Sequence, residues 1–420
     1  MSVSFEQMQR VRREFHQIAE PGWLEFQTTV RIIDYLKDYG YEDISYGKAI
    51  HGQRMGLPHP NEMKSYRESF DLNVDYDISE ILEGYTGVVA RLDTGKEGPT
   101  IAMRFDIDAN GIEESKDEDH RPNRENFRSQ NDFAMHACGH DGHITIGLFV
   151  AKWLMDNKDD LRGKFVLIFQ PAEEGVRGAK SMVEAGVLDG VDYLLAGHIG
   201  LNVESGIIGL GTIGFLATTK LDIYFEGVPS HAGAAPELGR NALLAAASCA
   251  LNLHTLTQFS KGMSRLNVGV LRAGSSRNIV ADKALMQIET RGENEEVNEM
   301  LKEKVEKVIA GSAMAFGVEY RIEEVGSAPA YNTYDEELVV YIGEHLGEKG
   351  FTVQVARSLG GSEDVTYMMN EVEKNGGKAL HFMFGSDIKA PHHNNRFDFD
   401  ERTLERAYKA LTTTIQLLIK

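Results

Sequence analysis

The sequence predicts an α/β protein with a mainly parallel sheet and an inserted α+β domain. A chain of 420 residues is too long for one compact core, so two domains are expected. Up to about residue 214, short β-rich runs alternate with longer helical stretches, which is the pattern of a parallel sheet. After that point the order becomes strand–helix–strand–strand–helix–strand, which is typical of a ferredoxin-like domain.

The first domain opens with "MSVSFEQMQRVRREFHQ", which reads as the start of an amphipathic helix. Apolar runs then predict two strands, a largely buried helix, a strand, a helix and another strand. In chain order these are "TGVVARLD", "TIAMRFDID", "GHITIGLFVAKWLMDN", "KFVLIFQP", "GAKSMVEAGVL" and "DYLLAGHIG". Two polar stretches, 51–77 and 113–132, interrupt the alternation, and the sequence assigns neither a structure nor a role to them.

The second domain is predicted from six consecutive segments. They are "TTKLDIYFEGV", "NALLAAASCALNLHTL", "SRLNVGVLRAG", "ADKALMQIETRG", "EEVNEMLKEKVEKVIAGSAMAF" and "VEYRIEEV". We therefore expect residues 215–326 to form an inserted domain within a first domain made of 1–214 and 327–420. The first domain ends in the helix "DERTLERAYKALTTTIQLLIK".

Composition excludes several classes of function. The formal charge of −20 and the lack of a large basic patch argue against nucleic acid as a partner. No stretch approaches eighteen uninterrupted apolar residues, so no membrane span is expected, and the N-terminus lacks the apolar core of a signal peptide. Two cysteines in so long a chain form no disulfide framework, which favours a reducing cytoplasm.

The stretch "MHACGHDGH" concentrates possible metal ligands. In an extended segment, residues two apart face the same way, so His136, Cys138 and His140 could share one side. A thiolate among imidazoles suits Zn²⁺ or a similar ion. Taken alone, the cluster fits equally well with exposed imidazoles around a buried cysteine.

Three other segments carry donors of the same kind. In "FQPAEEG", Glu173 and Glu174 follow a strand, so one can bind a metal while the other acts as general base; a solvated acidic pair is the alternative. In "LLAGHIG", His198 lies at the carboxyl end of a strand, where ligand sites of open α/β sheets gather. "PHHNNRFDFD" places His392 and His393 in a polar turn. Together the four segments predict a metal centre.

The combined motifs resemble a known family. "RFDIDA", "MHACGHDGH", "QPAEEG", "GHIG", "GVPSHAG", "GSEDV" and "HHNNRFDFDE" are similar, in order and over nearly the whole chain, to the metallo-amidohydrolases of the aminoacylase and glutamate carboxypeptidase superfamily. Within it they resemble the branch of hippurate, auxin-conjugate and aminobenzoyl-glutamate hydrolases. The resemblance implies a Zn-peptidase-like catalytic domain with two divalent metal ions, Zn²⁺ or Mn²⁺. It also implies that 215–326 is a lid domain that mediates homodimerisation.

The resemblance assigns a role to each donor. It implies that Glu173 is the general base and that five side chains hold the metals: Cys138 bridging both, His140 and Glu174 on one, and His198 and His393 on the other. A bridging thiolate has its lone pairs committed to metal, so Cys138 is expected to be a ligand and not a nucleophile. His136 is expected to be structural or to support a ligand, and His143 to lie outside the metal shell.

Two positions depart from the wider superfamily. A histidine ligand of the carboxypeptidases falls at Arg104, and their bridging aspartate falls at Cys138. The resemblance implies that His140 supplies the missing imidazole. Asp106 then becomes a carboxylate that orients a ligand.

Substrate-contacting residues are predicted in and near the inserted domain. His231 in "GVPSHAG" resembles a family histidine that stabilises the tetrahedral oxyanion, often across a dimer interface. Asn278 and Arg291 resemble positions that contact the substrate carboxylate, although both residue types also commonly hold turns together. Gly361 in "LGGSEDV" allows close backbone approach to a ligand, and Glu363 or Asp364 could reach the pocket or cap a helix.

These observations predict a metal-dependent amidohydrolase of N-acyl or N-aroyl amino acids. The leading substrate is p-aminobenzoyl-glutamate, which would give p-aminobenzoate and glutamate. One alternative is a general hippurate or N-acetyl-amino-acid deacylase. Another is a non-catalytic member of a two-protein hydrolase, since the resemblance also suggests that a second, homologous chain is a partner.

Overall fold

A computed structural model describes residues 4–420, which divide into two compact units. The first unit runs to Ile213 and resumes in two further segments, Asn332–Leu359 and Asp364–Lys420. The second unit consists of Gly214–Tyr331 and Gly360–Glu363. Its main segment ends at Tyr331, whereas the boundary expected from the sequence was 326, and its role as a lid and dimerisation domain stays a prediction.

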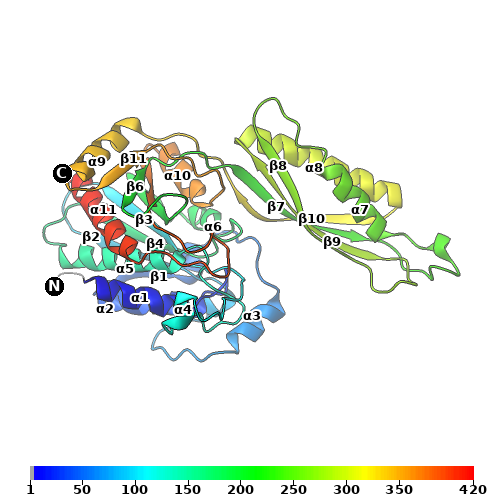
Figure 1. Ribbon diagram of the computed structural model, residues 1–420, viewed down its shortest axis with the longest axis horizontal. Helices are drawn as coiled ribbons and strands as arrows, with labels where there is room; N and C mark the ends of the chain where they lie inside the picture. Colours follow the sequence, from blue (N-terminus) through cyan, green and yellow to red (C-terminus); the bar gives the residue numbers. More distant parts are fainter. Residues whose placement is uncertain (1–3) are drawn as a thin grey trace. The chain divides into compact units, whose positions relative to one another are not determined.

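The first unit is built on an eight-stranded sheet of order β1-β2-β4-β3-β5-β12-β6-β11 (Figure 1). Its strands are β1 (Asp43–Tyr46), β2 (Val88–Asp93), β3 (Thr100–Asp106), β4 (Lys164–Gln170), β5 (Tyr193–Ile199), β6 (Ile207–Leu210), β11 (Thr352–Val355) and β12 (Lys378–Phe384). The central strands β4, β3, β5 and β12 are parallel, whereas β1, β2 and β6 join by antiparallel pairing. The predicted mainly parallel sheet is confirmed.

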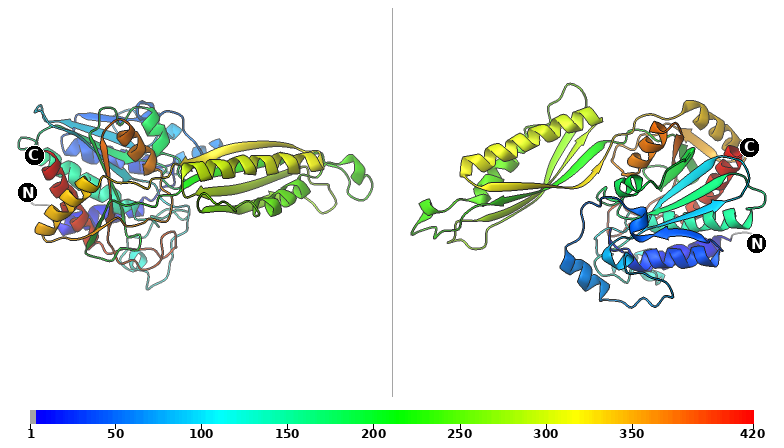
Figure 2. Two further views of the ribbon diagram at one scale, coloured as in Figure 1. Left: turned by 90° about the horizontal axis from the view of Figure 1, so that it is seen from above. Right: turned by 180° about the vertical axis from the view of Figure 1, so that it is seen from behind.

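Helices cover both faces of this sheet (Figures 1 and 2). One face carries α1 (Phe5–Gln17), α2 (Phe26–Asp38), α5 (His140–Asp156) and α11 (Arg402–Leu418). The other carries α6 (Ala179–Glu184) and α10 (Val365–Lys374), and α9 (Glu336–Glu348) packs beside β11. In α5, a Cβ on Gly147 would lie 2.7 Å from the Phe105 ring, so the glycine lets this helix approach the sheet closely.

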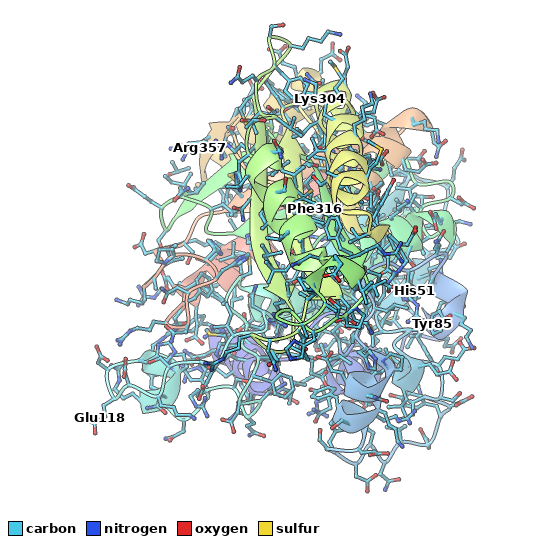
Figure 3. All side chains as sticks on the ribbon, turned by 90° about the vertical axis from the view of Figure 1, so that its right-hand side faces the viewer. His51, Tyr85, Glu118, Lys304, Phe316 and Arg357 are labelled. Atoms are coloured by element: carbon cyan, nitrogen blue, oxygen red, sulfur yellow. The ribbon has the colours of Figure 1, made fainter. Side chains whose placement is uncertain are left out.

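The second unit is a four-stranded antiparallel sheet of order β10-β7-β9-β8. Its elements are β7 (Ala217–Glu226), α7 (Ala242–Leu253), β8 (Ser264–Ala273), β9 (Lys283–Gly292), α8 (Glu295–Phe316) and β10 (Glu319–Ala328). The two helices lie side by side on one face of the sheet, and Figure 3 labels Lys304 and Phe316 along α8. The predicted ferredoxin-like order is confirmed, and Cys249 is buried in this core as expected.

The two unassigned polar stretches contain short helices, α3 (Pro60–Arg67) and α4 (Arg121–Arg124). The second stretch is held by the buried carboxylate of Glu114. This carboxylate accepts hydrogen bonds from His16 Nε2 at 3.0 Å, His120 Nε2 at 2.9 Å and the Ser129 amide at 2.7 Å. Burial disfavours a charge on His16, but Glu114 and Asp141 outweigh that effect and raise its pKa to about 9. The stretch is therefore tied to α1 by charged hydrogen bonds. Across the described residues no helix is both long and apolar enough to cross a membrane.

His51, labelled beside Tyr85 in Figure 3, is a buried histidine that stays neutral. Its Nε2 donates to the Thr86 carbonyl at 2.7 Å, and its Nδ1 lies 2.9 Å from Ser181 Oγ. Burial, assisted by the charge of Arg54, lowers the pKa of His51 from 6.5 to about 4.

Acidification is expected to destabilise the protein through His51. The unfolded chain binds a proton near pH 6.5 and the folded chain only near about pH 4, so this contribution is complete above 6.5 and is lost as the pH falls through that window. The shift corresponds to about 3 kcal/mol of unfolding free energy. Urea unfolding at about pH 7.5 and about pH 4.5 should show a smaller pH dependence for His51→Gln than for the wild type. Equal pH dependence in the two proteins would contradict the assignment.

Candidate metal centre

The predicted donors of the first unit gather at the carboxyl ends of its parallel strands. Asp106 ends β3, the pair Glu173 and Glu174 follows β4, and His198 lies near the end of β5. Cys138 and His140 lie at the start of α5, which begins at His140. The topology thus brings segments far apart in sequence to one edge of the sheet.

All predicted metal ligands belong to one cluster of donor atoms. Among the described residues, four overlapping groups have all their ligand atoms within 4.8 Å of one another: Cys138–His140–His198, Cys138–Glu174–His393, His140–Glu173–Glu174 and Asp106–His140–His143. Cys138 Sγ lies 3.3 Å from His198 Nε2, and His393 Nε2 lies 3.3 Å from Glu174 Oε1. Cys138 and Glu174 each belong to two of these groups and His140 to three, so the bridging role of Cys138 stays a prediction. His393 lies with Glu174 in these groups, whereas the resemblance paired it with His198.

Two histidines of the cluster, His140 and His198, are oriented by hydrogen bonds from the ring nitrogen that faces away from the other donors. His140 Nδ1 donates to the Asp108 carbonyl at 2.8 Å, and His198 Nδ1 donates to the Ile199 carbonyl at 2.8 Å. Because a carbonyl can only accept, each Nδ1 carries a proton, which leaves the Nε2 of each ring available to the cluster. This arrangement is typical of metal-binding histidines.

His140 Nε2 provides a direct test of whether the site fits a metal. This buried nitrogen has no hydrogen-bond partner within residues 4–420, and Asp106 and Glu173 oxygens lie 3.7 and 4.0 Å from it. Although burial opposes a charge on His140, the Asp106 carboxylate raises its pKa well above the ordinary value. The acidic surroundings thus favour a cation at this point, and the donor set fits a divalent metal.

Cys138 is poorly suited to act alone. Its side chain is buried, and burial followed by the charge of Glu174 raises the pKa of the thiol. A reactive thiol needs the opposite shift, whereas a bound cation would deprotonate this one. The environment therefore supports a ligand and argues against a nucleophile.

Asp106 and His143 form a hydrogen-bonded pair that shares one donor group with His140. Asp106 accepts hydrogen bonds from His143 Nδ1 and from Arg104 Nη1, the latter at 2.7 Å. His143 Nε2 accepts from the Ile199 amide at 2.9 Å, so both of its nitrogens are in use and it is unsuited to binding metal. Asp106 lies 3.7 Å from His140 Nε2, beyond hydrogen-bond distance. The acceptor that orients His140 is the Asp108 carbonyl, and the expected role of Asp106 in orienting a ligand stays a prediction.

Two more histidines border the cluster. His392 Nδ1 lies 3.6 Å from Cys138 Sγ, and its Nε2 accepts from the Leu201 amide at 3.3 Å. His136 is fully buried with neither nitrogen hydrogen-bonded in the described chain, and burial lowers its pKa to about 3. A neutral, inward-facing His136 agrees with the structural role expected for it.

Sequence reasoning missed the carboxylates that hold the Glu173–Glu174 loop. Asp108 accepts hydrogen bonds from the backbone amides of both glutamates, each at 2.9 Å. Glu25 accepts from the Ala172 amide at 2.8 Å. Asp108 could have been found, because it lies two residues after Asp106 in "RFDIDA" and so shares its face in an extended segment.

The predicted substrate contacts of the second unit do not form one group. His231 and Asn278 are exposed and lie on adjacent segments, joined by a hydrogen bond from the Ala232 amide to the Asn278 carbonyl at 2.9 Å. Arg291 lies near the far end of β9, about 26 Å along the strand from Lys283. Its guanidinium pairs with Glu289 at 3.1 and 3.2 Å. Arg291 and Asn278 of one chain therefore cannot contact the same small substrate.

Gly361 lies at the same end of the second unit as Arg291. Its carbonyl accepts a hydrogen bond from the Leu216 amide at 2.7 Å, and the next residue, Ala217, pairs with Gly292. The glycine thus helps to join the short segment Gly360–Glu363 to β7.

The donor cluster and the fold agree with the relatives of the chain. Residues 102–417 match the model of peptidase family M20/M25/M40. The chain belongs to this family. It is 43% identical, over the full length of both chains, to a Haemophilus influenzae homolog of a p-aminobenzoyl-glutamate hydrolase subunit. An indole-3-acetyl-aspartic acid hydrolase of Enterobacter agglomerans is also 43% identical, over 97% of this chain and 95% of that one.

A solved structure gives the same result. The aminobenzoyl-glutamate utilization protein of Klebsiella pneumoniae is 37% identical and superposes with a TM-score of 0.80, over 98% of this chain and 95% of that one. Family membership and hydrolase relatives together make the chain a metal-dependent amidohydrolase. The predicted enzyme class is confirmed.

Proposed function

We propose that the chain hydrolyses the amide bond of N-aroyl amino acids, with p-aminobenzoyl-glutamate as its leading substrate. One observation carries the proposal: Glu173 and Glu174 lie beside a buried thiol and imidazoles in a chain similar end to end to a homolog of a p-aminobenzoyl-glutamate hydrolase. The products would be p-aminobenzoate and glutamate. Indole-3-acetyl-aspartate is the second candidate, because a hydrolase named for it is equally similar.

The chemistry divides between the metals and Glu173. Two divalent ions, Zn²⁺ or Mn²⁺, would activate a water and polarise the amide carbonyl, held by Cys138, His140, Glu174, His198 and His393. Glu173 would accept the proton of the attacking water and deliver it to the departing amine nitrogen. The thiolate favours Zn²⁺, whereas the carboxylates also suit Mn²⁺.

His231 is the proposed donor to the tetrahedral oxyanion. Its Nδ1 accepts from the amides of Gly233 at 3.2 Å and Ala234 at 3.1 Å, so the neutral ring carries its proton on the exposed Nε2. We assign the substrate carboxylate to Asn278 in preference to Arg291, because Glu289 already occupies the Arg291 guanidinium. Gly361 remains a proposed point of close backbone approach.

Assays on the purified chain test this proposal. The chelator-treated protein should be inactive and should recover with Mn²⁺ or Zn²⁺, and p-aminobenzoyl-glutamate should have the highest kcat/KM. Indole-3-acetyl-aspartate, hippurate and N-acetyl amino acids are the comparison substrates. Highest activity on N-acetyl amino acids would replace the proposal by a general deacylase.

A homologous second chain is a further proposal, supported by the word "subunit" in the name of the Haemophilus influenzae relative. If the chain hydrolyses p-aminobenzoyl-glutamate alone, no partner is needed for catalysis. If activity appears only after addition of a homologous second chain, the two-protein hydrolase is supported. The intact Glu173 argues against a non-catalytic role for this chain.

Homodimerisation through the second unit is proposed from its surface. Strand β8 is an edge strand, and the helix α7 beside it exposes Leu243, Leu244 and, at 77%, Leu251. An edge strand next to exposed leucines is suited to pairing with a second copy.

The dimer can be tested at Leu251. We expect sedimentation to give a dimer for the wild type and a larger monomer fraction for Leu251→Glu, because burying a carboxylate in an apolar interface is costly. Met314→Glu on α8, also highly exposed, is the matched control and should leave the dimer intact. A shift produced by the control alone would place the interface elsewhere.

A further inference from the structure

The loop that carries Glu173 and Glu174 contains two residues whose backbone conformation is rare for any residue other than glycine. Ala172 has a φ of 52° and Val176 a φ of 57°, both in the left-handed region that disfavours residues with a Cβ. Such conformations are strained and persist only where neighbouring groups enforce them. Neighbouring groups must therefore hold this loop in place.

Three buried carboxylates hold it, and we call them the carboxylate cradle: Glu25, Asp108 and Asp364. Glu25 accepts the Ala172 amide at 2.8 Å. Asp364 Oδ2 accepts the amides of Gly178 at 3.0 Å and Ala179 at 2.9 Å. The two oxygens of Asp108 take one amide each, those of Glu173 and Glu174. Five backbone amides along 172–179 thus bind carboxylates from three distant segments.

Burying three carboxylates is energetically unfavourable, which indicates that the carboxylate cradle does more than close the loop. All three carboxylates are at most 1% exposed. Burial, followed by the charge of Asp108, raises the pKa of Glu25 to about 8. Burial likewise raises the pKa of Asp364 to about 7, although the Arg104 guanidinium 3.1 Å away acts in the opposite direction. A loop that needed only closure could use neutral backbone carbonyls, which do not carry this penalty.

Asp108 differs from the other two because it fixes three residues of the site at once. Its side chain holds the backbone of Glu173 and Glu174, and its carbonyl accepts the Nδ1 proton of His140. A rotation of either glutamate's peptide plane would swing its carboxylate away from the donor cluster. The direction of both carboxylates therefore depends on Asp108.

We propose that Asp108 is a positioning residue for hydrolysis, which aims Glu173 and Glu174 through their backbone amides, while Glu25 and Asp364 hold the two ends of the loop. The inference rests on the proposed function in its assignment of Glu173 as base and Glu174 as ligand. Asp108 contacts neither metal nor substrate in this scheme and acts only through its neighbours.

Asp108→Asn is the variant of choice. An asparagine of the same shape offers one oxygen and one N–H₂ group, so one of the two glutamate amides loses its acceptor and faces a donor. We expect kcat for p-aminobenzoyl-glutamate to fall about 10- to 100-fold with KM within about threefold, because misplacing a catalytic group affects the reaction more than binding. We also expect Co²⁺ to bind at least about tenfold more weakly to the chelator-treated chain and to give an altered cobalt–thiolate absorption.

Glu20→Gln is the matched control. Glu20 is also a fully buried carboxylate that accepts backbone amides, those of Gln27 at 3.2 Å and Thr28 at 2.8 Å, but it has no part in the loop 172–179. The Glu20→Gln variant should lower the free energy of unfolding and leave kcat and Co²⁺ binding unchanged. If Asp108→Asn loses only stability, as the control does, the positioning role is wrong.

Two further variants keep the proposal testable if Asp108→Asn does not fold. Glu25→Gln and Asp364→Asn each leave one carbonyl oxygen for the loop, so both should lower kcat and weaken Co²⁺ binding in the same direction but less. Wild-type values in both would overturn the proposal. If the wild type hydrolyses none of the substrates, the proposed function fails, whereas Co²⁺ titration still decides whether the cradle shapes the donor cluster.

Discussion

Glu173→Ala is expected to lose at least about 10³-fold in kcat while the protein still binds its metals, because a positioned general base contributes about 10²–10⁴-fold and here serves both water and leaving group. Glu173 lies in the donor group with His140 and Glu174, and its Oε2 is 4.0 Å from His140 Nε2. Glu173 is thus close to the proposed ligands without being one of the five, so its removal should leave the metal ligands in place.

The measurement combines steady-state kinetics with metal content. Rates on p-aminobenzoyl-glutamate give kcat and KM, and elemental analysis gives the metals bound per chain. Glu118→Ala is the control, since Glu118 is an exposed glutamate labelled in Figure 3 and distant in sequence from the donor segments. The variant should differ from this control in kcat alone. Full activity in Glu173→Ala would remove the base assignment, and loss of metal would make Glu173 a ligand.

The positions of the donors were predictable because they depend on strand ends. "FQPAEEG" and "LLAGHIG" each end an apolar run, and parallel strands meet at a common edge, so Glu173, Glu174 and His198 had to approach one another. Cys138 and His140 were predicted from their residue types only in combination with the other three donor segments, because a cysteine among histidines fits a buried thiol equally well when taken alone. The same alternation of apolar runs predicted the succession of strands and helices in the second unit and the mainly parallel character of the first sheet, but not the order of the strands within either sheet.

The orientation of the donors was not predictable, because their hydrogen-bond partners are distant in sequence. His140 takes its acceptor from Asp108, and the Glu173 amide takes the side chain of the same residue. Period-two spacing places Asp106 and Asp108 on one face but cannot choose between them. Likewise, Asn278 and Arg291 are far apart because β9 is long. A match to short motifs carries no information on the length of a strand between them.

The polar stretch 113–132 was unreadable for a related reason. Its charges look solvated, yet Glu114 is buried and hydrogen-bonds His16 of the first helix. His16 also contacts Asp141, the residue after His140, at 2.8 Å. The stretch is therefore linked by charges to the start of α5, where the metal donors lie. When the partner of a charged residue is distant in the sequence, the sequence alone cannot distinguish a buried, paired charge from a solvent-exposed one.

Arg12→Met tests this charged network and is expected to lower the free energy of unfolding by about 3–5 kcal/mol, because removing one partner leaves buried charges uncompensated. Arg12 is fully buried in α1. Its guanidinium contacts Asp141 at 2.7 Å, Asp398 at 3.1 Å and Glu401 at 3.3 Å. Methionine matches the length of the arginine stem, so the effect isolates the lost charge more than a lost volume.

Urea unfolding followed by circular dichroism measures the change. Arg10→Met is the matched control, since Arg10 is exposed on the same helix, and it should alter stability by no more than about 0.5 kcal/mol. Arg12→Lys should fall between the two, because an ammonium keeps the charge but cannot reach three carboxylates in fork geometry. If Arg12→Met were as stable as the control, Arg13 and Arg121, which also pair with Glu401, would suffice to neutralise the cluster. Arg12 would then not be required for stability, and His16 alone would provide the contact between α1 and Asp141.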